Sequence, residues 1–145
     1  MYQTKRRILC VDDHEDTHTM LAAILGSCGH EVVSVSNPLS GLVMARNQCF
    51  DLFILDRLFM DGKGTDLCKR IREFDPSTPV VFFTGDNAES ARLESFDAGA
   101  QGYITKPDID GLLSTVNALL GGFRLSGCDY KSRTAITGSW VQPSH

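Results

Sequence analysis

Three aspartates stand directly after two short apolar runs of the sequence. Asp12 and Asp13 follow the run 8–11, and Asp56 follows the run 52–55. A carboxylate at the end of a buried strand is unusual, because removing an unpaired charge from water costs several kcal/mol. Three carboxylates placed in this way therefore predict a cation held at one edge of a sheet.

The residue types indicate which ion would bind. Carboxylate oxygens suit hard cations, and Mg²⁺ typically takes one or two carboxylates, several waters and phosphate oxygens. We expect Asp13 and Asp56 to be direct ligands and Asp12 to act through a water molecule. The backbone carbonyl of Leu58 is the predicted further ligand. Mg²⁺ is the expected ion, with Mn²⁺ as an alternative.

A carboxylate beside such an ion can also react. Asp56 is the predicted nucleophile, because attack of a carboxylate on phosphorus gives an aspartyl phosphate, a recognised covalent intermediate. Thr84 ends another apolar run and can donate a hydroxyl hydrogen bond to a phosphate oxygen, and Gly85 leaves room beside it. Lys106 would supply a compact positive charge to the same oxygens.

Apolar runs and amphipathic stretches alternate along the chain, which predicts an α/β fold with a parallel sheet and helices on both faces. In such sheets ligands bind outside the carboxyl ends of the strands, where the candidate residues stand. The predicted strands are 8–11, 31–36, 52–55, 80–83 and 102–105, and the predicted helices are 15–28, 38–49, 65–74, 87–98 and 108–120.

Length and charge limit the possible functions. The 145 residues fit one domain, which we expect to span 1–120, followed by a tail or linker over 121–145 that could dock through 135–141. The net charge of −4 argues against nonspecific nucleic-acid binding, which needs a basic surface. No apolar run approaches the length of a membrane span and no signal-peptide pattern opens the chain, so a cytoplasmic protein is expected.

The motifs resemble those of the receiver (REC) domain of two-component response regulators, over about 7–120. Successive spacings of 43, 28 and 22 residues separate Asp13, Asp56, Thr84 and Lys106, as in that family. The matching residues are Val11-Asp12-Asp13, Leu55-Asp56, Thr84-Gly85 and Lys106-Pro107, with Tyr103 at the position of the family's aromatic switch residue.

The resemblance implies a flavodoxin-like, doubly wound sheet with strand order 2-1-3-4-5. It also implies a phosphorelay switch: a sensor histidine kinase or histidine phosphotransfer protein donates a phosphoryl group to Asp56, Thr84 moves toward it and Tyr103 turns inward. The surface of the fourth helix, fifth strand and fifth helix would then change. A cis bond at Lys106-Pro107 is expected as well.

The same resemblance implies a protein that is not an enzyme beyond its own phosphorylation and dephosphorylation. Output would pass through a downstream protein target or an output domain missing from this sequence, with homodimerisation as a further possibility. No helix pair for DNA binding follows 120, and we expect no direct contact with nucleic acid or membrane.

Some residues depart from the family pattern. In the loop after Asp56, Met60 stands where proline is usual and Lys63 where an acidic residue is usual. These changes could alter the rates of phosphorylation and dephosphorylation and the choice of partner. Arg57 could pair with a phosphate or a kinase acid, or face solvent, and Asp86 could influence attack of water on the acyl phosphate. Four histidines show no metal-ligand spacing and receive no predicted role: His14, His18, His30 and His145.

Three alternatives remain beside the switch. A haloacid-dehalogenase-type phosphatase would need Asp-x-Asp at the nucleophile, whereas Arg57-Leu58 follows Asp56. A flavin or nucleotide binder would need a phosphate-binding loop after the first strand, where this chain is acidic. The third alternative is a receiver-like module that no longer takes phosphate and acts as a protein-interaction domain.

Overall fold

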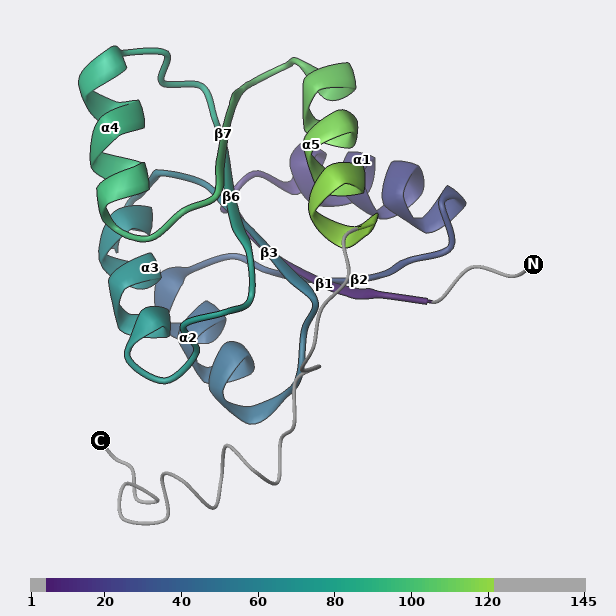
Figure 1. Cartoon of the computed structure of the whole chain (residues 1–145), viewed down its shortest axis with the longest axis horizontal. Coiled ribbons are helices and arrows are strands. Elements are labelled where there is room, and N and C mark those ends of the chain that lie inside the picture. Colours follow the sequence, from purple (N-terminus) through teal and green to yellow (C-terminus); the bar gives the residue numbers. More distant parts are fainter. Residues whose placement is uncertain (1–4, 122–145) are drawn as a thin grey trace.

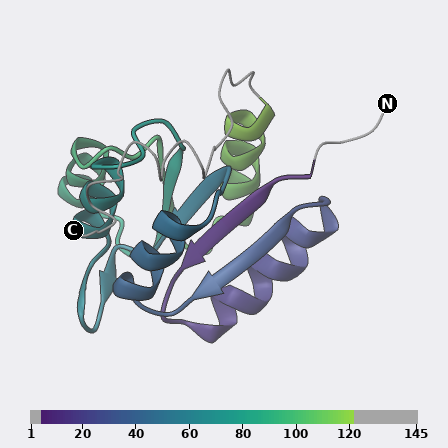
Figure 2. The same cartoon turned by 90° about the horizontal axis from the view of Figure 1, so that it is seen from below.

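The computed structural model describes residues 5–121, and these form one parallel five-stranded sheet covered by helices (Figure 1). The strand order is β2-β1-β3-β6-β7, which is the predicted 2-1-3-4-5 arrangement once the two strands of a separate hairpin are left out. Figure 2 shows the arrows of β1 and β2 side by side and pointing the same way. The strands are β1 (Arg7–Val11), β2 (Glu31–Val35), β3 (Leu52–Leu55), β6 (Val80–Thr84) and β7 (Gly102–Thr105).

Five helices cover the two faces of this sheet, as predicted. One face carries α1 (Glu15–Ser27) and α5 (Ile109–Gly121); the other carries α2 (Pro38–Asn47), α3 (Gly64–Arg72) and α4 (Glu89–Asp97) (Figure 1). Two covered faces explain why the central strands are apolar throughout rather than alternating. All four residues of β3 and all five of β6 are buried.

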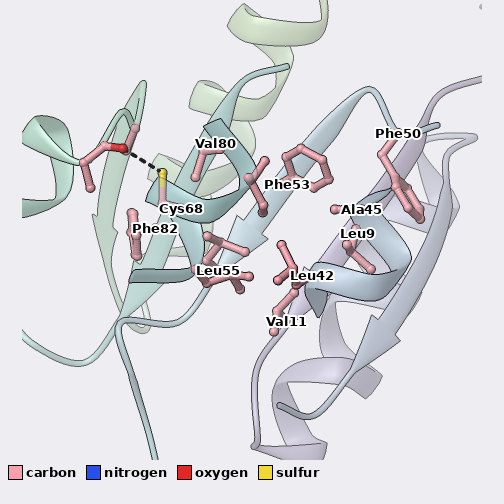
Figure 3. Close-up of a cluster of buried hydrophobic side chains, with 14 residues drawn as sticks. Leu9, Val11, Leu42, Ala45, Phe50, Phe53, Leu55, Cys68, Val80 and Phe82 are labelled. Atoms are coloured by element: carbon pink, nitrogen blue, oxygen red, sulfur yellow. Dashed lines mark hydrogen bonds between the residues drawn. The ribbon is translucent and has the colours of Figure 1, made fainter. Parts of the chain in front are cut away.

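The alternation of side chains along each strand divides the core into two clusters. Leu9, Val11, Phe53 and Leu55 point toward α2 and α3, as Figure 3 shows, whereas Ile8, Cys10, Leu52 and Ile54 point toward α1 and α5. The first cluster also contains a polar contact, because the Cys68 thiol donates a hydrogen bond of 3.4 Å to the Ala98 carbonyl (Figure 3). This bond links α3 to the end of α4.

Local sequence signals set several helix ends. The Asn37 side chain accepts a hydrogen bond of 2.8 Å from the Ser40 amide, and Pro38 occupies the first turn of α2. Gly29 and Gly99, with φ of 90° and 116°, follow α1 and α4 in the left-handed region that glycine tolerates best. The predicted helices 15–28 and 87–98 end directly before these two glycines.

The segment after Asp56 differs from its prediction as a plain loop. It forms a two-stranded antiparallel hairpin of β4 (Leu58–Phe59) and β5 (Gly62–Lys63), and α3 starts directly after it. At Gly64 a Cβ atom would overlap the Asp56 carbonyl oxygen, so no side chain fits at this position. Glycine there lets the start of α3 pass close behind Asp56.

No helix within 5–121 combines the length and apolar character needed to cross a membrane. The predicted tail 121–145, with the docking stretch 135–141, lies outside the described residues apart from Gly121 at the end of α5.

Candidate functional site

The topology brings the three predicted aspartates together. β1 and β3 are neighbours with Val11 opposite Leu55, so the residues that follow these two strands emerge side by side. The Asp56 amide continues the ladder by donating to the Val11 carbonyl at 2.9 Å. One potential ligand atom from each of four residues lies within 4.8 Å of the others: Asp12, Asp13, His14 and Asp56.

Lys106 reaches the same cluster from the end of β7. Its ammonium Nζ lies 2.9 Å from Asp12 Oδ2 and 3.6 Å from Asp56 Oδ2. The peptide bond between Lys106 and Pro107 is cis, as the resemblance implied. The two carboxylates are buried, with 2% of Asp12 and 5% of Asp56 exposed, so water screens this contact little.

Thr84 and Tyr103 meet at the segment between β6 and α4. The Thr84 hydroxyl oxygen accepts a hydrogen bond of 3.3 Å from the Asp86 amide. The Tyr103 hydroxyl donates to the Asp86 carbonyl at 2.5 Å, and its ring packs 6.3 Å from that of Phe82. Tyr103 is thus half-buried, and its hydroxyl is bound to the segment that follows Thr84.

Arg57 is held within the protein and does not face solvent. Its Nη1 donates to Asp86 Oδ2 at 3.1 Å and its Nη2 donates to Glu94 Oε1 at 2.6 Å, and 14% of its side chain is exposed. The partners foreseen from sequence were a phosphate or a kinase acid. Its partners in the fold are two acids far along this chain, one between β6 and α4 and the other on α4.

Comparison with known proteins identifies the family. The model of the response regulator receiver domain matches residues 8–117. The chain belongs to this family.

The curated relatives that the chain matches include regulatory proteins of which it covers less than half. It is 35% identical over 120 residues to the transcriptional regulatory protein ZraR of Klebsiella oxytoca, covering 82% of this chain and 27% of that protein. The sequence thus spans about a quarter of this curated relative's length. The activity of the whole relative does not transfer with the match.

Solved receiver domains share the fold. A CheY-like receiver domain of Methanospirillum hungatei JF-1 superposes with a TM-score of 0.77 at 29% identity, covering 81% of this chain and 95% of that one. The receiver domain of the sensor histidine kinase PA1611 of Pseudomonas aeruginosa, 23% identical, has a TM-score of 0.74 and covers 82% and 100%. That structure contains a magnesium ion coordinated in its active-site cleft.

The surroundings of Asp56 in this receiver domain disfavour its ionised form. Burial raises the pKa of Asp56, and the neighbouring Asp12 carboxylate raises it further. Lys106, the Arg57 amide and the Thr84 hydroxyl oppose this rise without reversing it. A divalent cation at this place would favour the ionised form.

His14 is the member of the cluster that sequence reasoning missed. Its Nδ1 lies 2.8 Å from Asp12 Oδ1, 3.2 Å from Asp13 Oδ1 and 3.6 Å from Asp56 Oδ2. The hydrogen bond with Asp12 raises the pKa of His14. The sequence did contain a signal for this role, because His14 directly follows the two aspartates. The spacing between the histidines themselves carries no such signal.

The structure also places His18, which had no predicted role, and Leu58, whose carbonyl was a predicted ligand. His18 Nε2 hydrogen-bonds the Asp12 carbonyl at 2.5 Å, which supports the turn that carries the aspartates. Leu58 pairs with Lys63 in the hairpin, with its side chain half exposed. Its carbonyl as an ion ligand stays a prediction.

Proposed function

We propose that this receiver domain accepts a phosphoryl group on Asp56 in the presence of Mg²⁺ and works as a signalling switch. The observation that carries the proposal is the convergence of Asp12, Asp13, Asp56 and Lys106 on one point at the carboxyl ends of β1, β3 and β7. Burial raises the pKa of Asp56 and the neighbouring Asp12 carboxylate raises it further, so a cation bound beside Asp56 would favour its ionised form.

The donor set fits a hard divalent ion. Asp12, Asp13 and Asp56 offer carboxylate oxygens, and the Leu58 carbonyl is the predicted further ligand. Mg²⁺, or Mn²⁺ in its place, would neutralise charge on the incoming phosphoryl oxygens.

Each residue has a distinct part in the transfer. A carboxylate oxygen of Asp56 attacks phosphorus, the bond from phosphorus to the donor's imidazole nitrogen breaks, and that nitrogen keeps the electron pair. Lys106 would contact the new phosphoryl oxygens from its place between Asp12 and Asp56. The Thr84 hydroxyl would turn from the Asp86 amide to donate to the same group.

The readout would be a change in the surface of α4, β7 and α5, with Thr84 and Tyr103 as switch residues. A sensor histidine kinase or a histidine phosphotransfer protein is the proposed donor, in the cytoplasm. The ZraR relative is named a transcriptional regulatory protein, which favours an output domain or protein target over an activity of this domain itself. Beyond catalysing its own phosphorylation and dephosphorylation, the domain would be no enzyme.

Mass spectrometry tests the acceptor directly. The protein is incubated with Mg²⁺ and a small acyl-phosphate donor, and we expect one added phosphoryl group that hydroxylamine removes. Asp56→Asn should show no addition, while Asp51→Asn, altered at the start of β3 and the opposite end of the sheet, serves as the control. Equal uptake by Asp56→Asn would refute the assignment, and absence of uptake by the unaltered protein would favour the protein-interaction module.

A further inference from the structure

Asp86 joins three parts of the receiver domain that the proposed switch must coordinate. Its amide donates to the Thr84 hydroxyl oxygen, its carbonyl accepts from the Tyr103 hydroxyl, and its carboxylate accepts from Arg57. The other carboxylate oxygen of Asp86 accepts from the Ala88 amide at 2.9 Å, just before α4. The segment between β6 and α4 is therefore restrained from both neighbouring strands.

Arg57 is the link between this segment and the acceptor. It follows Asp56 directly, and its own amide donates to Asp56 Oδ1 at 2.7 Å. Its guanidinium extends in the other direction to Asp86 and, on α4, to Glu94. One largely buried residue thus contacts the acceptor through its backbone and α4 through its side chain.

We propose that Arg57 is a positioning residue whose bridge to Asp86 and Glu94 holds the β6–α4 segment and Tyr103 in the arrangement that binds the phosphoryl group. The inference rests on the proposed function and adds a regulatory element to it. A ligand binds more weakly when the competent arrangement is populated only in part, in proportion to that fraction. Breaking the bridge should lower that population and the apparent affinity with it.

A purely electrostatic explanation predicts the opposite change in anion affinity at Glu94. Removing the positive charge of Arg57 would weaken anion binding in either case. Removing the negative charge of Glu94 would strengthen anion binding if only the electrostatic field mattered. If the bridge matters, loss of the Glu94 carboxylate weakens binding, because Arg57 loses its partner on α4.

The experiment measures the affinity of the Mg²⁺-loaded protein for beryllium fluoride, a phosphoryl mimic, by isothermal titration calorimetry. Coupling between sites typically amounts to a factor of about 5 to 150. We expect Arg57→Ala to weaken binding about twentyfold and Glu94→Gln about fivefold. In the double variant, Glu94→Gln should add nothing to the loss caused by Arg57→Ala.

Helix α4 offers matched controls in a second ion pair. Arg92 Nη2 lies 2.9 Å from Glu89 Oε2, exposed and three residues apart on the same helix. Glu89→Gln and Arg92→Ala make the same charge changes without touching the Asp86 contacts, and both should leave the affinity unchanged. Melting curves for every variant separate a loss of affinity from a loss of folding, and Glu94→Gln alters an exposed side chain that we expect to tolerate the change.

A second readout follows Tyr103 itself. With fluorotyrosine incorporated and the Tyr103 signal assigned through Tyr103→Phe, ¹⁹F NMR should show that Arg57→Ala and Glu94→Gln shift the signal before any mimic is added. Tighter binding by Glu94→Gln, or additive effects in the double variant, would overturn the inference. Failure of the unaltered protein to bind the mimic or to accept phosphoryl would instead refute the proposed function, so the two failures are distinguishable.

Discussion

Two regions of the molecule shift the pKa of an acid in opposite directions. The first is the acidic pocket, formed by Asp12, Asp13, His14, Asp56 and Lys106. The second is the Arg57 bridge, formed by Arg57, Asp86 and Glu94. The pKa of Asp56 in the pocket is raised by burial and by Asp12. The pKa of Glu94 in the bridge is lowered by its hydrogen bond with Arg57.

Burial explains the difference between these regions. Side chains of Asp86 and Glu94 are 29% and 43% exposed, so water screens the charge that Arg57 leaves uncompensated. Asp12 and Asp56 have little such screening and share one ammonium group. The pocket therefore retains a strong attraction for a cation, whereas the two acids of the bridge are paired with Arg57 and partly exposed to water.

The largest expected difference in stability comes from removing the basic side chain of each region. Lys106→Met leaves the buried Asp12 without its ammonium partner and should lower the free energy of unfolding by about 3 kcal/mol. Arg57→Met removes a more exposed pair and should cost about 1 kcal/mol or less. Urea unfolding without divalent ions measures both. Adding Asp12→Asn to Lys106→Met should restore most of the loss; similar costs for the two single variants would contradict the comparison.

Added Mg²⁺ should stabilise the pocket and leave the bridge unaffected. At a concentration about one hundred times its dissociation constant, a ligand of the native state stabilises it by about 2.7 kcal/mol. We expect this gain in the unaltered protein and in Glu94→Gln, measured by thermal unfolding with and without the ion. Asp13→Asn should lose most of it. An undiminished gain in Asp13→Asn would place the ion elsewhere.

Removing one acid should change the free energy of unfolding in opposite directions in the two regions. Asp56→Asn should raise the free energy of unfolding on the order of 1 kcal/mol without divalent ions, since it removes a buried charge and its repulsion by Asp12. Glu94→Gln should lower it slightly.

The pH dependence of Asp56→Asn follows from the raised pKa of Asp56. Below the unfolded-state pKa of about 3.8 the acid is protonated in both states, and the variant gains nothing. As pH rises, the unfolded state loses its proton first, so the native protein loses stability relative to the variant until Asp56 ionises as well. Urea unfolding across this range should show the advantage of Asp56→Asn increasing and then levelling; a constant advantage would show that ionisation of Asp56 is not its source.

The smallest effect concerns His14, which is largely exposed. Its raised pKa means that its contribution to stability is present below the unfolded-state value of about 6.5 and is lost as pH rises through the folded-state value. NMR titration of the imidazole should find a value above 6.5 that falls when Asp12→Asn removes the partner. His30 is the internal reference, because burial lowers its pKa. A His14 value unaffected by Asp12→Asn would separate it from the pocket.

Sequence patterns predicted the parallel sheet and the meeting of the candidate residues at one edge, and the family resemblance supplied the strand order. Parallel strands place their carboxyl ends at one edge, so Asp12, Asp56 and Lys106 had to approach one another once the strands were recognised. The hairpin after Asp56 was missed because its two-residue strands carry no periodicity. His14 was missed because its role depends on the carboxylates around it.

The apolar runs, the breaks between them and the acids that follow them were sufficient to predict a parallel sheet with helices on both faces and the acids at one edge, because parallel strands place their carboxyl ends at the same edge. The doubly wound strand order was implied by the family motifs. The partners of Arg57 were decided by tertiary structure. Asp86 and Glu94 are 29 and 37 residues away, and only the folded chain brings the β6–α4 segment and α4 to Arg57. A long, flexible side chain can reach several acids from one backbone position, and the packed fold selects among them.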